Sequence, residues 1–102
     1  MTKIPTCRLT AKLHLLATAA GGRQSPIKQN VYRPQFYLGS SSASCRLDAM
    51  EPEAMSPGDA GEVEMTLVHP ERFGMDLRAG SKFVLREGAK VVGWGIIEDV
   101  RS

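Results

Sequence analysis

Hydrophobic and polar residues alternate along two segments of the chain with the two-residue period of a β-strand. Cys7–Leu15 alternates over its whole length, as expected when one face of a strand is buried and the other is solvated. Gly61–His69 repeats the pattern, with Val63, Met65 and Leu67 on one face. The sequence therefore predicts two strands at these positions.

Four further segments have a strand-like composition without such regular alternation. Val31–Leu38 contains three aromatic residues, and Pro34 within it belongs at an edge, a bulge or a strand start because proline cannot donate a ladder hydrogen bond. Ala43–Met50 is a weaker strand. Ser81–Arg86 and Lys90–Glu98 flank a short turn that contains glycine, so this part of the chain is predicted to be a β-hairpin.

The segments between the predicted strands consist of turns and loops. Thr18–Asn30 predicts a long loop, and Glu51–Ala60 contains several turn signals. Glu71–Gly80 is interpreted as an irregular connection, because no stretch of the chain has helical periodicity over a useful length. Two glycines in the last predicted strand, Gly93 and Gly95, indicate a bend or a close approach of another backbone. The apolar residues expected to cover a barrel end from the irregular connection are Phe73, Met75 and Leu77.

The predicted strands fit one all-β domain that spans residues 1–102. A chain of 102 residues has the size of one ordinary domain, and 42% hydrophobic with 24% charged residues is the composition of a folded soluble protein. Six strands in so small a domain predict a closed antiparallel β-barrel, because closure removes the exposed strand edges that promote aggregation. No apolar run approaches the roughly 20 residues that cross a bilayer, and the first residues lack an export signal, so we expect a cytoplasmic protein.

The net charge bears on whether the chain binds nucleic acid, and the cysteines bear on whether it holds zinc or a disulfide. A formal charge of +2 is too small to require a nucleic-acid partner by itself, although a local basic patch would still indicate one. Cys7 and Cys45 lie far apart in predicted strands and lack the spacing of a zinc site. Buried free thiols are favoured over a disulfide, which agrees with a reducing cytosol.

The sequence contains no pattern typical of catalysis. An active site needs a nucleophile with a base, two carboxylates in different environments, or a metal cluster. His14, Glu62 and Glu64 lie on the polar faces of predicted strands, where solvated side chains are the usual arrangement. The stretch from Gly21 to Arg23 lacks the downstream lysine and the helix of a phosphate-binding loop. We therefore predict no enzymatic activity, metal, cofactor or small-molecule substrate.

Six short motifs follow one another along the chain. They are Gly21-Gly22-Arg23-Gln24-Ser25-Pro26, Tyr32-Arg33-Pro34-Gln35-Phe36-Tyr37, Met55-Ser56-Pro57-Gly58-Asp59, Thr66-Leu67-Val68-His69-Pro70, Phe83-Val84-Leu85-Arg86-Glu87-Gly88 and Val91-Val92-Gly93-Trp94-Gly95. Each motif is weak alone, but six in register are specific. In this order they resemble motifs of the third, C-terminal domain of elongation factor Tu, and the resemblance covers about residues 7 to 100. It implies a six-stranded antiparallel barrel with a role in translation, here free-standing and without the GTPase domain and second barrel of the full factor.

The resemblance also implies an RNA-binding site. In the family, this domain holds the T stem of aminoacyl-tRNA largely through backbone contacts, which is recognition of the shape of an A-form helix. Arginines would neutralise phosphates, polar and acidic side chains would bond ribose hydroxyls, and a glycine would let the RNA backbone approach closely. Arg33 and Pro34 are interpreted as strand-shaping residues instead. The implied tRNA-facing residues are Arg23, Gln24, Gln35, Ser44, His69, Arg86, Glu87 and Gly88.

The chain departs from the family pattern in ways that leave an alternative function open. Ala89 and Lys90 replace a glycine and an arginine, and a lysine loses the bidentate phosphate geometry, so weaker RNA binding is expected. Trp94 replaces a small residue. The alternative is a protein-interaction module, since the same domain docks other domains and the nucleotide exchange factor in the family. A third possibility is a domain that is excised from a larger factor or works in trans with one encoded elsewhere.

Surface features distinguish the two main alternatives. An exposed apolar patch around Trp94, Phe36 or Tyr37 would favour protein interaction, because aromatic residues anchor interfaces. A continuous positive surface would favour RNA binding. That surface would run through Arg23, Lys28, Arg33 and Arg86.

Overall fold

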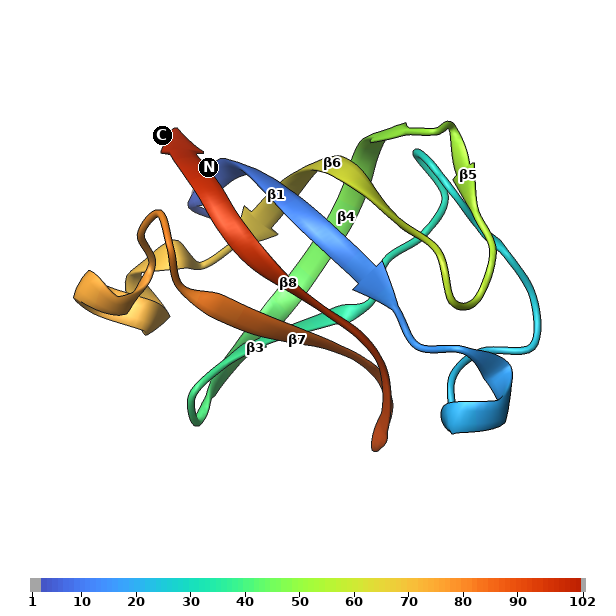
Figure 1. The fold of residues 1–102 in the computed structure, drawn as a ribbon. Coiled ribbons are helices and arrows are strands. Elements are labelled where there is room, and N and C mark those ends of the chain that lie inside the picture. Colours follow the sequence, from blue (N-terminus) through green and yellow to red (C-terminus); the bar gives the residue numbers. More distant parts are fainter. Residues whose placement is uncertain (1–2, 102) are drawn as a thin grey trace.

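The computed structural model describes residues 3–101 and places six antiparallel strands in a closed barrel (Figure 1). The strands follow the order β1-β6-β4-β3-β7-β8, and β8 pairs with β1 to close the barrel. The predicted fold class is therefore confirmed. The barrel strands are β1 (Thr6–Leu15), β3 (Gln35–Leu38), β4 (Ser41–Glu51), β6 (Ala60–Val68), β7 (Lys82–Glu87) and β8 (Lys90–Arg101).

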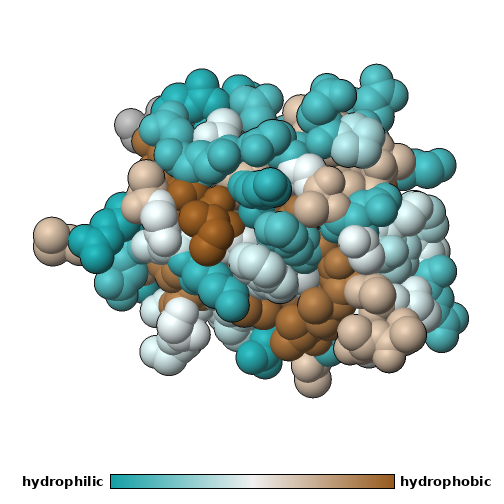
Figure 2. Space-filling model, in the orientation of Figure 1, coloured by the Kyte–Doolittle hydropathy of each residue, from teal (hydrophilic) through white to brown (hydrophobic). Residues whose placement is uncertain are grey.

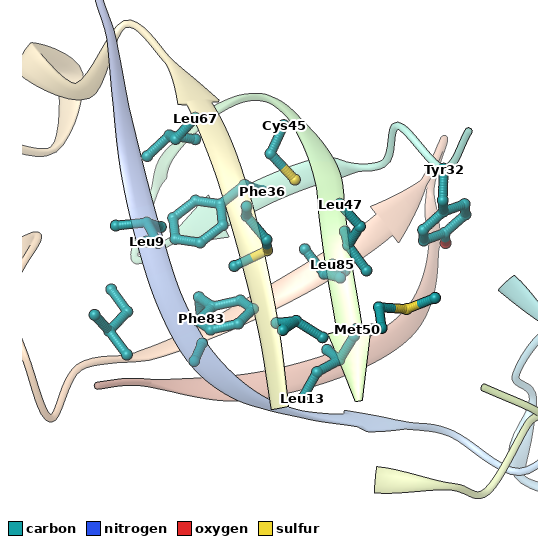
Figure 3. Packing of buried hydrophobic residues seen from close by; sticks show 14 of the residues in the cluster. Leu9, Leu13, Tyr32, Phe36, Cys45, Leu47, Met50, Leu67, Phe83 and Leu85 are labelled. Carbon is teal, nitrogen blue, oxygen red and sulfur yellow. The ribbon is translucent and has the colours of Figure 1, made fainter. Parts of the chain in front are cut away.

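Alternation along the strands fills the barrel with apolar side chains (Figure 3). Phe36 and Phe83 are fully buried and stack with ring centroids 4.8 Å apart, and Phe73 meets Phe36 edge to face at 5.4 Å. Full burial of one such side chain contributes about 1.5 to 3 kcal/mol. Phe36 is therefore a core residue and contributes nothing to the apolar surface patch considered from the sequence.

The second predicted strand is shorter than the aromatic pattern indicates. β3 begins at Gln35, and Val31 is 72% exposed in a turn after Asn30, whose φ of 68° is left-handed. The carbonyls of Tyr32 and Pro34 still accept hydrogen bonds from β4, from the amides of Leu47 at 3.0 Å and Cys45 at 3.1 Å respectively. Pro34 donates none in return, since it has no N–H, and it precedes the strand start as predicted.

Two short 3₁₀ helices occupy segments that were predicted to be irregular. The long loop contains η1 (Thr18–Ala20), and the connection after β6 contains η2 (Pro70–Asp76). Figure 1 shows η2 at one end of the barrel and η1 near the other. Helices this short leave no periodicity in the sequence. The long loop and the turn region also contribute a small sheet of β2 (Ile27–Lys28) and β5 (Ala54–Met55).

The connection after β6 covers the barrel end with two of its three apolar residues. Phe73 is buried and Leu77 packs partly buried against the core, but Met75 is 87% exposed. The prediction for Met75 is therefore wrong. The reason is local: each residue of a 3₁₀ helix turns by a third of a revolution, and Gly74 breaks the helix with a φ of 56°, so Met75 faces away from Phe73.

Close backbone approach explains the two glycines in β8, as predicted. A Cβ atom at Gly95 would lie 2.5 Å from Cζ of Phe83 and 2.5 Å from the carbonyl oxygen of Lys12. At Gly93 it would lie 2.8 Å from the carbonyl oxygen of His14. Glycine here lets β8 pack against β1 and leaves room for the Phe83 ring.

Both cysteines are buried free thiols, as the sequence indicated. Burial raises the pKa of Cys7, and burial with a smaller effect from Asp48 raises the pKa of Cys45 to about 12. None of the helical segments within residues 3–101 has the length and apolarity of a membrane-spanning helix.

Candidate nucleic-acid interface

Three of the predicted RNA-facing residues lie side by side on the outside of the barrel. Gln35 on β3 is opposite Ser44 on β4 and opposite Arg86 on β7. Directly opposed residues in antiparallel strands project to the same face. The next residues along the strands, such as Phe36 and Leu85, are buried, so this row faces outward. We call Arg86, Gln35 and Ser44 the polar row.

Arg86 is a positioned cation without a counter-ion. Its guanidinium carbon lies 4.5 Å from the centroid of the Tyr37 ring, a cation–π contact that holds the side chain against the barrel. Within residues 3–101 it forms no ion pair, and its buried Nε has no hydrogen-bond acceptor. The guanidinium is therefore available to an anionic ligand.

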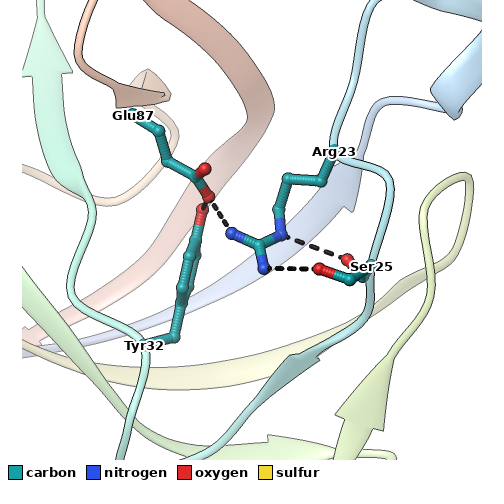
Figure 4. A network of polar contacts seen from close by, with 4 residues as sticks. All are labelled: Arg23, Ser25, Tyr32 and Glu87. Carbon is teal, nitrogen blue, oxygen red and sulfur yellow. Dashed lines mark hydrogen bonds and ion pairs between the residues drawn. The ribbon is translucent and has the colours of Figure 1, made fainter.

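Arg23 and Glu87, both predicted to face RNA, bind each other (Figure 4). Nη1 of Arg23 and the hydroxyl of Tyr32 donate to the same Oε2 of Glu87. Nε of Arg23 donates to the Ser25 carbonyl at 3.1 Å, Nη2 donates to the Ser25 hydroxyl at 3.1 Å, and the guanidinium lies 4.8 Å from the Tyr32 ring centroid. These contacts fasten the long loop to the end of β7.

The cluster shifts the acid–base equilibria of its members. Burial and then the hydrogen bond to Glu87 raise the pKa of Tyr32, so the phenol stays protonated. Burial alone would raise the pKa of Glu87, but the hydrogen bonds from Tyr32 and Arg23 outweigh it and hold the pKa below its usual range. The Arg23 charge is thus compensated internally. The continuous positive surface considered from the sequence is interrupted at this residue.

Gln24 and Gly88 lie beside this cluster. Gln24 follows Arg23 and is exposed. Gly88 is the first of two residues that join β7 to β8, and its φ of 62° with an ordinary φ at Ala89 is the pattern of a type II′ hairpin turn. Nothing lies within 4 Å of the place a Cβ would occupy at Gly88. The space beside the Gly88 backbone is therefore open, two residues along the chain from Arg86.

His69 lies at the border of the row. It follows Val68, the last residue of β6. Cys45 on β4 is paired with Leu67 on β6, so the next pair along these antiparallel strands would be Ser44 and Val68. His69 has a left-handed φ of 52°, and its amide donates to the Pro5 carbonyl at 2.8 Å. Nδ1 of its ring lies 3.2 Å from Oε2 of Glu71. The His69 ring is therefore engaged in local contacts next to the polar row.

A second outward row contains Trp94 and Tyr37, two of the three aromatic residues around which an exposed apolar patch was considered from the sequence. Tyr37, Val84, Trp94 and His14 are opposed in turn across β3, β7, β8 and β1, and all four are half-buried. We call these four residues the aromatic row. The His14 ring stacks on Trp94 with centroids 4.2 Å apart, so the expectation of a fully solvated His14 is corrected. Figure 2 shows separate hydrophobic patches among hydrophilic residues on the side of the barrel where β1, β7 and β8 lie.

Acidic side chains gather away from both rows. Glu51, Glu62, Glu64 and Glu98 line a shallow groove, where Glu62 is exposed and Glu64 pairs with Arg101 at 3.2 Å. Among residues 3–101 no group of three or more His, Cys, Asp or Glu side chains is arranged to hold a metal ion. The outer surface of the barrel is therefore divided between polar, aromatic and acidic regions.

Comparison with known protein families matches residues 3–101 to the family described as the elongation factor Tu C-terminal domain. The match extends over nearly the whole chain and agrees with the six motifs and with the six-stranded barrel.

Proposed function

The chain belongs to the elongation factor Tu C-terminal domain family, and on that premise we propose that it is a non-enzymatic, translation-associated module that binds the acceptor and T stem of tRNA. It is a translation-factor-type β-barrel domain. The observation that carries the proposal is the register of Arg86, Gln35 and Ser44 on three neighbouring strands beside the open backbone of Gly88. Its two buried free thiols suit the reducing cytoplasm, where translation takes place.

The polar row has the chemistry that an A-form RNA backbone requires. Neighbouring strands lie about 4.8 Å apart, so three opposed residues span about 10 Å. Along that span Arg86 offers a charge for a phosphate, and Gln35 and Ser44 offer hydrogen bonds for ribose hydroxyls. The contacts that the row offers are therefore suited to the backbone and shape of RNA.

Arg23 and Glu87 take part in this site by positioning rather than by direct contact. Their ion pair ties the long loop to the β7–β8 turn. Gln24 and Gly88 are then held on either side of the cluster. A small contact area leaves little net binding free energy after the entropic and desolvation costs of association. We therefore expect an affinity that is roughly micromolar at best.

The test is titration of the chain with aminoacylated and uncharged tRNA at low and physiological salt. The variant Gln35→Ala/Arg86→Gln is expected to weaken binding, and loss of one phosphate contact should reduce the slope of log K against log salt by about 0.7 to 0.9. Arg78→Gln, which removes an exposed charge after η2, is the matched control. The absence of saturable tRNA binding even at low salt would remove this function.

The aromatic row favours protein interaction as a second candidate function. Four half-buried side chains in register form a strip, and Lys82 lies 4.6 Å over the Trp94 ring. Aromatic residues of this kind anchor protein interfaces. The expected partner is another translation-factor domain, including a GTPase domain or second barrel supplied in trans.

A further inference from the structure

A row of arginines runs parallel to the polar row on the outside of the barrel. Thr66 on β6 is opposed by Arg46 on β4 and by Arg8 on β1. Arg33 lies beside Arg46. The amides of the two neighbours of Arg46, Cys45 and Leu47, donate to the carbonyls of the two neighbours of Arg33, Pro34 at 3.1 Å and Tyr32 at 3.0 Å. The neighbouring strand positions are buried, so these side chains face outward. We call Arg33, Arg46, Thr66 and Arg8 the arginine row.

An open groove of about 480 Å³ lies between the arginine row and the polar row. Arg33 and Gln35 are two positions apart along the chain, as are Arg46 and Ser44, which corresponds to about 6.6 Å in an extended strand. Arg33, Arg46 and three hydroxyl residues line the groove, and Ser44 belongs to the polar row as well. The hydroxyl residues are Thr6, Ser44 and Thr66.

The charges along the arginine row are only partly compensated. Nε of Arg46 donates to Asp48 at 2.6 Å, and the other carboxylate oxygen of Asp48 accepts from the Thr66 hydroxyl at 2.6 Å. Arg8 and Arg33 are exposed, and neither forms an ion pair with any residue that the structure describes. Two free cations therefore flank a fixed Arg46–Asp48–Thr66 unit.

We propose that the arginine row is a second phosphate-binding strip, with Arg8 and Arg33 as its phosphate ligands. The groove takes the phosphodiester backbone of the RNA helix that the polar row holds. This inference rests on the proposed function and extends its site beyond the tRNA-facing residues that the resemblance implies, to residues that include Arg33, which the sequence alone indicated as strand-shaping.

The chemistry of the groove favours RNA over an acidic protein. An RNA backbone alternates phosphates with ribose hydroxyls, and the groove is lined by the guanidinium groups of Arg33 and Arg46 and by three hydroxyl groups, beside Cys45 and Val68. Protein interfaces are anchored by aromatic and other large apolar residues in pockets. The large outward aromatic residues lie in the aromatic row, on the far side of the polar row from this groove.

The experiment compares tRNA binding by the natural chain and by Arg8→Gln/Arg33→Gln over a series of salt concentrations. Loss of two phosphate contacts should reduce the magnitude of the slope of log K against log salt by about 1.4 to 1.8 and lower the affinity at low salt. Lys12→Gln/Arg78→Gln removes equal charge away from both rows and should keep the natural slope. Arg8→Lys/Arg33→Lys should largely restore the slope, because lysine also neutralises a phosphate. Circular dichroism and urea unfolding verify that each variant is folded.

The outcomes separate this inference from the proposed function. If the natural chain binds tRNA and Arg8→Gln/Arg33→Gln binds with the same slope, the arginine row has no RNA role and the polar row stands alone. If the natural chain binds no tRNA at low salt, both proposals fail. If it instead binds poly-glutamate with the same dependence on Arg8 and Arg33, the occupant is an acidic protein and the RNA assignment is overturned.

Discussion

A single carboxylate, Glu87, joins two parts of the chain that are far apart in sequence. It accepts hydrogen bonds from Arg23, 64 residues away, and from Tyr32, 55 residues away. Hydrogen bonds to charged groups contribute more to folding stability than hydrogen bonds between neutral groups. We therefore expect Glu87 to stabilise the contact between these two parts of the chain. Partial exposure of both charged side chains limits the size of the effect.

Glu87→Gln is therefore expected to lower the free energy of unfolding by about 1 kcal/mol in urea denaturation near neutral pH. Glu71→Gln is the control, since Glu71 is an exposed carboxylate that forms an ion pair with His69 and with no other residue in the range 3–101. Equal stability of the natural chain and Glu87→Gln would show that the cluster contributes nothing.

The difference in unfolding free energy between the natural chain and Glu87→Gln should also depend on pH. The pKa of Glu87 is lowered by folding, so its contribution is present in full above its unfolded pKa of about 4.3 and is lost as the pH falls through the lower folded value. Unfolding free energies measured from about pH 7 to pH 3 should converge for the natural chain and Glu87→Gln. A gap that stays constant down to acid pH would contradict this assignment.

At the scale of elements, β8 depends on glycine where it crosses β1. A Cβ at Gly95 would overlap both the Phe83 ring and the Lys12 carbonyl oxygen. The Phe83 ring is itself stacked in the core, so it has little room to move. Glycine at position 95 is thus required by packing on the core side of β8. The outward side chains of the aromatic row do not take part in this packing.

Gly95→Ala should accordingly destabilise the barrel by about 1 to 3 kcal/mol, the usual cost of overpacking a core. Urea unfolding measures the change, with Lys90→Ala, an exposed position on the same strand, as the control. A stability equal to that of the natural chain would mean that β8 can move away from Phe83 at no cost.

On the scale of the whole molecule, three outward rows lie next to one another. Along β3 and the segment before it, Tyr37, Gln35 and Arg33 belong to the aromatic, polar and arginine rows in turn. Arg86 connects the polar row with the aromatic row through its contact with Tyr37. RNA binding and protein binding would therefore use adjacent strips and not opposite sides of the barrel.

This arrangement predicts that Trp94→Ala separates the two candidate functions. It removes the centre of the aromatic row, so it should weaken binding to separately produced GTPase and second-barrel domains by tenfold or more if Trp94 is an interface anchor. tRNA affinity should change less than twofold, because Trp94 lies outside the polar row. Calorimetric titration of each ligand measures both effects. A large loss of tRNA affinity would contradict the assignment of RNA to the polar row.

Much of the fold follows from local sequence features. Alternation in Cys7–Leu15 and Gly61–His69 located β1 and β6, and turn residues located the hairpin of β7 and β8. The two 3₁₀ helices and the exposed Met75 were missed because such short helices have no periodic signature. β3 was predicted too long because aromatic content indicates a strand without showing where proline interrupts its hydrogen bonds.

The sequence by itself determined the all-β class, the family and the residue types of the site, because these depend on patterns between near neighbours and on short motifs. Which of those residues lie together was decided by the tertiary structure. Arg86, Gln35 and Ser44 form a row only through the pairing of β7, β3 and β4, and Arg8 joins Arg46 only through β6. Cross-strand register arises when the barrel closes and a single alignment buries every apolar face at once, a condition that no local segment contains.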